Sequence, residues 1–282
     1  MRARIFSFSI FSFLLFTAAA CLQATEPAAP SGSSEVSQEA AAETPASGKL
    51  KVAIYSLSMQ KKRIAHILEE DGAFECTPVS GEDIKNGILE GFDFVLLPGG
   101  SGRGQARSMQ PEGVANLKKF VHDGNGYLGI CAGAYFPMQQ GFLNGNTKSP
   151  KWLRGEEHLD LELTEEGLEV FGEEFRGIQK VRYANGPVFD INIDPNMPQV
   201  EVLAWFRSET AKNGTPAGIQ VNSPAMVRTT YGNGMLITFS PHPESSDTLC
   251  VFLPKALRYM AKYLNKPIPE NAPNQPAAEK AN

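Results

Sequence analysis

Short apolar runs alternate with amphipathic segments along the middle of this chain. Between the first two runs, Ile64, Ile67 and Leu68 recur at the spacing of one helical face. Strands that alternate with helices in this way are typical of a parallel sheet. We therefore predict an α/β fold with a doubly wound, flavodoxin-like, mostly parallel sheet. The runs predicted as its strands are 50–55, 74–78, 92–97 and 235–239.

Several helix boundaries are marked by residues with the appropriate local chemistry. Ser80 and Asp83 have the spacing of a capping pair, which predicts a short helix after residue 80. Pro111 suits a first helical turn, and apolar residues follow it on one side of the predicted helix. A last helix over 247–264 is predicted to cover the sheet with its apolar face.

The pattern changes between residues 141 and 233, where predicted strands follow one another with few helices between them. Such a stretch favours antiparallel pairing beside the parallel core. We expect this insertion to form one wall of a pocket. Its predicted strands are 158–163, 180–183, 200–206 and 225–231.

The N-terminus resembles a bacterial export signal. Arg2 and Arg4 precede an apolar stretch over 5–20 that ends in small residues, which predicts a signal peptide over 1–20. A membrane span is the weaker alternative, because this stretch is short for one. Cys21 follows the small residues and is a candidate for lipid attachment. We therefore expect an exported protein of the periplasm or cell envelope, either lipid-anchored or secreted in soluble form.

Composition separates one folding region from two flanking segments. Residues 21–48 are rich in proline, alanine, serine and glutamate and predict a disordered tether. Residues 266–282 predict a disordered tail. The remaining region, 49–265, suits a single domain, and a hydrophobic content of 42% is enough for a full core.

Charge and cysteine usage limit the classes of partner. The formal net charge of −5, without a cluster of lysine or arginine, argues against nucleic-acid binding. Cys76 and Cys250 are expected to be ordinary buried residues, while Cys131 stays free. No cysteine or histidine spacing indicates a metal site, and no cofactor is expected.

Two short motifs carry the candidate chemistry. Cys131 lies in Gly-Ile-Cys-Ala-Gly after an apolar run, as in a sharp turn from a strand into a helix whose amides favour a thiolate and can hold an oxyanion. His242 and Glu244 follow the strand 235–239 in Pro-His-Pro-Glu. Pro243 biases His242 away from helical backbone, so we expect both side chains on one face of an extended segment. A thiol, an imidazole and a carboxylate are the parts of a nucleophilic triad.

Each motif taken separately is weak, since buried cysteines and turn glycines are common. Their occurrence together, each at the end of a predicted strand, favours one site. The carboxyl ends of parallel strands are where doubly wound sheets place their ligands.

Four motifs together characterise this chain: Leu-Leu-Pro-Gly-Gly at 96–100, Gly-Ile-Cys-Ala-Gly-Ala-Tyr at 129–135, Tyr-Ala-Asn-Gly-Pro at 183–187 and Pro-His-Pro-Glu at 241–244. With them the chain resembles the class I glutamine amidotransferase-like superfamily, and most closely the N-terminal domain family of eukaryotic-type biotin-protein ligases. The resemblance spans about residues 50–264 and implies Cys131 as nucleophile, His242 as base and Glu244 as its orienting partner. It also implies an oxyanion hole formed by the amides of Gly100 and Ala132.

One position departs from the glutaminases of this superfamily, which usually carry glutamine where this chain has Tyr135. Glutamine is therefore not the expected substrate. Further candidate substrate-binding residues come from the glycine-rich loop and from the 183–187 motif. With Tyr135, the candidates are Gly99, Arg103, Tyr183 and Asn185.

Other conspicuous residues favour structural interpretations. The glycine-rich stretch 99–104 lacks the Lys-Ser/Thr ending of a phosphate loop, so an oxyanion loop is favoured. Trp152 and Trp205 are expected in the core rather than on a ligand. Surface positions are expected for the histidines without a partner at catalytic spacing, namely His66, His122 and His158.

From these observations we expect hydrolysis of an amide or related bond in a small or peptide-like substrate, through a thioester on Cys131. The alternative is a tethered binding module that uses the same pocket without turnover. Protein partners and oligomeric state have no signal in the sequence.

Overall fold

The computed structural model describes residues 48–56 and 61–269. The predicted signal peptide, Cys21 and almost all of the predicted tether lie outside these residues, as does most of the predicted tail. Within the described part of the chain, no helix is both long enough and apolar enough to cross a membrane.

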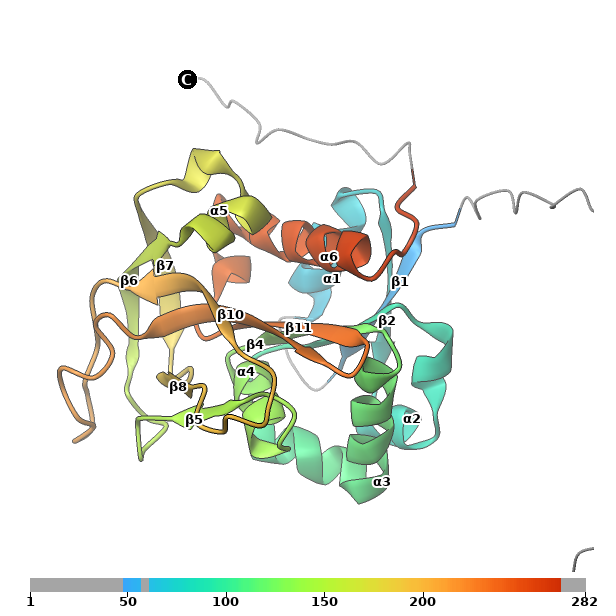
Figure 1. The fold of residues 1–282 in the computed structure, drawn as a ribbon, viewed down its shortest axis with the longest axis horizontal. Helices are drawn as coiled ribbons and strands as arrows, with labels where there is room; N and C mark the ends of the chain where they lie inside the picture. The colour runs from blue at the N-terminus through green and yellow to red at the C-terminus, as the bar shows by residue number, and fades with distance from the viewer. Residues whose placement is uncertain (1–47, 57–60, 270–282) are drawn as a thin grey trace, which may run out of the picture. The chain divides into compact units, whose positions relative to one another are not determined.

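A nine-stranded sheet in the order β2-β1-β3-β4-β11-β10-β9-β6-β7 forms the centre of the described domain (Figure 1). From β2 to β11 neighbouring strands run parallel, and from β11 to β7 they run antiparallel. The predicted α/β fold with a parallel core is confirmed for the strands from β2 to β11. The antiparallel strands from β11 to β7 make the sheet as a whole mixed. The strands are β1 (Leu50–Tyr55), β2 (Phe74–Val79), β3 (Phe94–Leu97), β4 (Gly126–Ile130), β6 (Glu156–Leu163), β7 (Ile178–Ala184), β9 (Glu201–Phe206), β10 (Pro224–Tyr231) and β11 (Gly234–Phe239).

Helices cover both faces of the sheet, as a doubly wound fold requires. In Figure 1, α1 (Lys61–Glu70), α5 (Glu165–Phe171) and α6 (Phe252–Tyr263) lie above it, and α2 (Gly81–Lys85), α3 (Gly102–His122) and α4 (Ala132–Gln139) lie below it. The helices on each face pack against the sheet around a separate cluster of buried apolar residues. Leu257 of α6 packs in one cluster and Leu117 of α3 in the other.

The central strands form because their residues are apolar on both faces. Every residue of β3, β4 and β11 is buried. This is the expected burial of parallel strands that have helices on either side. Their adjacent carboxyl ends place the segments after β3, β4 and β11 at one edge of the sheet.

Local capping chemistry accounts for two helix starts. The Ser80 hydroxyl accepts a hydrogen bond from the Asp83 amide at 3.1 Å, and the Asp83 carboxylate accepts one from the Ser80 amide at 2.8 Å. This capping box confirms the pair predicted from the sequence. A helical stretch also begins at Pro111, because Gln110 has φ 58° and interrupts α3 there. The preceding turns of α3, from Gly102, were not predicted.

The region 141–233 contains the four predicted strands in antiparallel pairing. The sequence pattern missed α5, and it also missed a small separate sheet of β5 (Gly145–Thr147) and β8 (Phe189–Ile191). The last predicted helix begins later than expected. A short 3-10 turn over Leu249–Val251 precedes α6.

Single-residue expectations about burial are met unevenly. The histidines His66, His122 and His158 are exposed, as predicted. Cys76 and Cys250 are half-buried rather than buried: Cys76 lies on the outermost strand β2, and Cys250 lies in the short 3-10 turn Leu249–Val251.

Candidate functional site

Cys131 occupies a strained turn between β4 and α4. Its backbone has φ 53° and ψ −99°, and its amide donates to the Phe239 carbonyl of β11 at 2.8 Å. The flanking glycines are needed for close packing. A Cβ on Gly133 would lie 1.9 Å from the Leu97 carbonyl oxygen, and one on Gly129 would lie 2.3 Å from the Gly133 carbonyl oxygen. The turn therefore aims the thiol away from the sheet at the start of α4.

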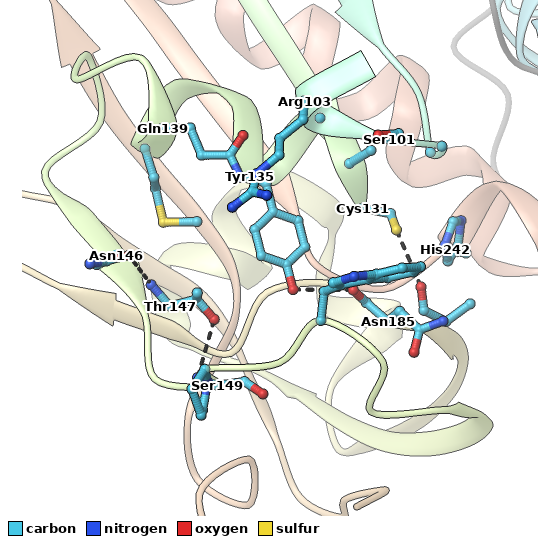
Figure 2. Close-up of a pocket in the computed structure, with 18 of the residues that line it drawn as sticks. Ser101, Arg103, Cys131, Tyr135, Gln139, Asn146, Thr147, Ser149, Asn185 and His242 are labelled. Atoms are coloured by element: carbon cyan, nitrogen blue, oxygen red, sulfur yellow. Dashed lines mark hydrogen bonds between the residues drawn. The ribbon is translucent and has the colours of Figure 1, made fainter. Parts of the chain in front are cut away.

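His242 follows β11 and meets Cys131 at the same edge of the sheet. The His242 amide donates to the Arg182 carbonyl at 2.7 Å, which holds this segment against β7. The imidazole Nδ1 lies 2.7 Å from Glu244 Oε1. Figure 2 shows the His242 ring beside the Cys131 sulfur.

The contact between His242 and Glu244 arises differently from the sequence expectation. His242 is non-helical, with φ −114° and ψ 71°, as Pro243 predicts. Glu244, however, lies in a short 3-10 turn, η3 (Pro243–Ser245), and not in extended backbone. The turn folds the carboxylate back onto the ring.

Burial and hydrogen bonding act on His242 in opposite directions. Burial lowers the pKa of the imidazole, but the hydrogen bonds and charges of Cys131 and Glu244 outweigh it and raise the pKa to about 10. Only 4% of His242 and none of Glu244 is exposed to solvent. The imidazolium form is therefore favoured at neutral pH, and the Nδ1 contact leaves Nε2 for the sulfur.

A residue far away in the sequence fixes the η3 turn. Arg63 of α1 donates from Nε to the Glu244 backbone carbonyl at 2.6 Å and from Nη2 to Asp247 at 3.1 Å. Arg63 was not a candidate from the sequence, because no local pattern relates it to the Pro-His-Pro-Glu motif.

The segment 184–187 passes directly over the thiol. The Ala184 carbonyl accepts a hydrogen bond from Cys131 Sγ at 3.3 Å. Asn185 has φ 59°, and its side-chain oxygen accepts from the Gly155 amide at 2.7 Å. A Cβ on Gly186 would lie 2.1 Å from the Ser240 carbonyl oxygen. The Tyr-Ala-Asn-Gly-Pro motif therefore allows the 184–187 segment to pack closely against Cys131 and Ser240.

A cavity of about 660 Å³ opens in front of Cys131 and His242 (Figure 2). The carboxyl ends of β3 and β4 supply one side of it, and the insertion supplies the other, as predicted. Gly99, Gly100, Arg103, Tyr135 and Asn185 line this cavity. The other residues that line the cavity, none of them among the binding candidates from the sequence, are Ser101, Gly102, Met138, Gln139, Asn146, Thr147, Ser149, Pro150, Trp152, Arg182 and Ala184.

Two expectations about aromatic residues are wrong. Tyr183 is fully buried behind the cavity wall, where its hydroxyl donates to the Gly186 carbonyl at 2.7 Å. Trp152 is 60% exposed and lines the cavity instead of packing in the core. Trp152 lies in a loop and not on a strand, so no sheet covers it. Trp205 of β9 is half-buried.

The backbone around Gly100 and Ala132 suits hydrogen-bond donation into the cavity. Gly100 has φ 142°, a conformation that side chains with a Cβ rarely adopt. Ala132 is the first residue of α4, and both residues line the cavity. Among the described residues, neither amide has a hydrogen-bond acceptor within the protein.

Tyr135 joins α4 to the 184–187 segment. Its hydroxyl donates to the Asn185 carbonyl at 3.2 Å, and burial raises the pKa of this phenol above its usual value. The Tyr135 ring thus closes part of the cavity next to the thiol with a neutral side chain.

Comparison with known proteins identifies the fold that carries this site. Residues 54–150 match the family model described as biotin-protein ligase, N terminal. PurLQS from Thermotoga maritima is similar in structure with a TM-score of 0.56 and 19% identity, covering 77% of this chain and 100% of its own. A putative GMP synthase component from Thermoplasma acidophilum has a TM-score of 0.51 and 17% identity, covering 77% of this chain and 95% of its own. The chain has a class I glutamine amidotransferase-like fold, and its residues 54–150 are similar to the N-terminal domain of biotin-protein ligases.

Proposed function

We propose that this protein is a cysteine-dependent hydrolase of an amide or related bond. The observation that carries the proposal is the position of His242 at the edge of a cavity: its Nδ1 lies 2.7 Å from Glu244 Oε1, and its ring lies beside the Cys131 sulfur (Figure 2). Enzymes with similar folds support the class of protein but do not identify a substrate.

The first half of the proposed reaction transfers the acyl group to sulfur. The Cys131 thiolate attacks the carbonyl carbon and forms a C–S bond, while the carbonyl electrons move onto oxygen. The amides of Gly100 and Ala132 donate hydrogen bonds to this oxyanion. The C–N bond then breaks, and the His242 imidazolium donates its Nε2 proton to the departing amine.

The second half releases the acid. Neutral His242 accepts a proton from water as the water oxygen attacks the thioester carbon. The C–S bond breaks and the carboxylic acid is released. The Cys131 thiolate and the protonated His242 imidazole are thereby restored. Glu244 orients the ring through Nδ1 in both halves, which is the role of a third triad member.

A binding module that uses the same cavity is the second candidate, and one contact favours it. The Ala184 carbonyl oxygen lies 3.3 Å from the Cys131 sulfur. This contact stabilises a thiol and repels a thiolate, because the carbonyl oxygen carries partial negative charge. Hydrolysis therefore requires the His242 charge to outweigh this repulsion, whereas binding does not.

Acylation of the protein by p-nitrophenyl acetate, followed by mass spectrometry, separates the two candidates. We expect Cys131 to be acetylated at least about 10²-fold faster than Cys250, the internal reference thiol, and to lose the acetyl group over time. His242→Ala should abolish most of the difference in acetylation rate between Cys131 and Cys250. If Cys131 is acetylated no faster than Cys250 and His242→Ala changes nothing, the binding candidate replaces the enzyme.

We also propose that the protein acts outside the cytoplasm, as the sequence over 1–20 supports. Metabolic labelling with a radioactive fatty acid, compared between the natural protein and Cys21→Ser, tests the lipid anchor. Loss of label in Cys21→Ser supports an anchor, and an unlabelled natural protein in the periplasmic fraction supports soluble secretion. Recovery in the cytoplasm would overturn the proposal.

A further inference from the structure

The charges around the cavity differ from those of the chain as a whole. The chain has a net charge of −5, yet Arg103 and Arg182 line the cavity, and no aspartate or glutamate occurs among its described lining residues. A ligand in this cavity therefore meets positive charge in a protein that is otherwise acidic.

The two arginines differ in their availability. Arg182 is neutralised by Glu156, which accepts from Nη2 at 2.6 Å and from Nε at 2.7 Å. Arg103 is exposed, and among the described residues it has no ion-pair partner within 4.0 Å. In Figure 2 the Arg103 side chain extends from the start of α3 toward Tyr135. Arg103 is thus the available cation at this surface.

Two helices add to the positive potential. The part of α3 that precedes the interruption at Gln110 begins at Gly102, and the eight-residue α4 begins at Ala132; both of these residues line the cavity. The amino ends of helices carry partial positive charge, which favours anions. A cationic ligand would have to face Arg103, both helix ends and the His242 imidazolium without a lining carboxylate to compensate.

We propose that the substrate carries a negatively charged group that pairs with the Arg103 guanidinium while its scissile carbonyl lies at Cys131. Trp152 supplies an exposed aromatic face in the same cavity, so the uncharged part of the substrate includes an apolar or flat group. This inference rests on the proposed hydrolysis, and it narrows the substrate to anionic amides.

Charge-selective labelling of Cys131 in the full-length protein tests the inference without requiring turnover. The probes are two methanethiosulfonates of similar size, the sulfonatoethyl anion and the trimethylammonioethyl cation, with labelled Cys131 quantified by mass spectrometry. We expect the ratio of anionic to cationic rates at Cys131 to exceed that of N-acetylcysteine amide by at least about tenfold.

The variants decide which residue produces this preference. Arg103→Gln should lower the rate ratio at least about fivefold. Arg107→Gln is the matched control, because Arg107 is exposed on the same helix but does not line the cavity. An unchanged ratio in Arg103→Gln, or an equal fall in both variants, would overturn the proposal.

The charge-selective labelling and the acetylation of Cys131 test the two proposals independently. If Arg103 controls charge selectivity but Cys131 is not acetylated faster than Cys250, the cavity binds anions and the hydrolase assignment fails. If acetylation is fast and Arg103 has no effect on selectivity, hydrolysis stands and the anionic substrate class is wrong.

Discussion

At the level of single residues, the protonation of His242 depends on its two partners. Glu244→Gln removes a negative charge 2.7 Å from Nδ1 while keeping a hydrogen-bond acceptor. We expect the His242 pKa, about 10 in the natural protein, to fall by at least about one unit, equivalent to about 1.4 kcal/mol. The pH dependence of the histidine NMR signals measures this change. Glu70→Gln, which alters the carboxylate beside exposed His66, should leave the His242 titration unchanged.

Gly133 tests whether the motif around Cys131 is required for packing. An alanine there would place its Cβ 1.9 Å from the Leu97 backbone oxygen, and this oxygen belongs to a buried central strand that moves little. Gly133→Ala should therefore lower the free energy of unfolding by about 3 kcal/mol or more, measured by urea denaturation. Gly91→Ala is the control, because its Cβ meets nothing within 4 Å. Equal stability of the two variants would contradict the packing explanation.

At the level of elements, Arg63 connects α1 to the turn that carries Glu244. Arg63→Ala removes the 2.6 Å hydrogen bond to the Glu244 carbonyl, so η3 should open more often. We expect hydrogen exchange at the Ser245 and Ser246 amides, which bond to residues 242 and 243, to accelerate about fivefold, the effect of losing about 1 kcal/mol. Asp247→Asn removes only the exposed ion pair and should leave exchange unchanged. If both variants accelerate exchange equally, the Glu244 contact is not the one that holds the turn.

Elements with strong local signals could be predicted from the sequence, and short ones could not. The strand β1 has the predicted bounds because its apolar run, interrupted only by exposed Lys51, is buried on both faces. The helix α5 was missed because seven residues between strands give too little periodicity, and β5 was missed because Gly-Asn-Thr has no apolar run. Cys131, His242 and Glu244 were proposed as site residues from two local motifs. Arg182 and Trp152 reach the cavity only through tertiary folding, so no local pattern indicates them.

At the level of the whole molecule, His242 couples the site to stability. Its folded pKa of about 10 lies above its value of about 6.5 in an unfolded chain, so the folded state binds the proton more tightly. The stability from this proton is therefore complete below about pH 6.5 and is lost as pH rises through about 10. The site is expected to stabilise the fold most at neutral and mildly acidic pH.

The comparison between the natural protein and His242→Gln isolates this contribution, because all other titrating groups are shared. Urea unfolding under reducing conditions should show the stability difference shrinking by at least about 1.4 kcal/mol between pH 6.5 and pH 10, the free energy of one pKa unit. His158→Gln makes the same chemical change at an exposed position of β6 and serves as the control. A difference that stays constant or grows over this interval would mean that His242 is neutral in the folded protein. The thiol of Cys131 would then lack the imidazolium beside it that the proposed acyl transfer requires.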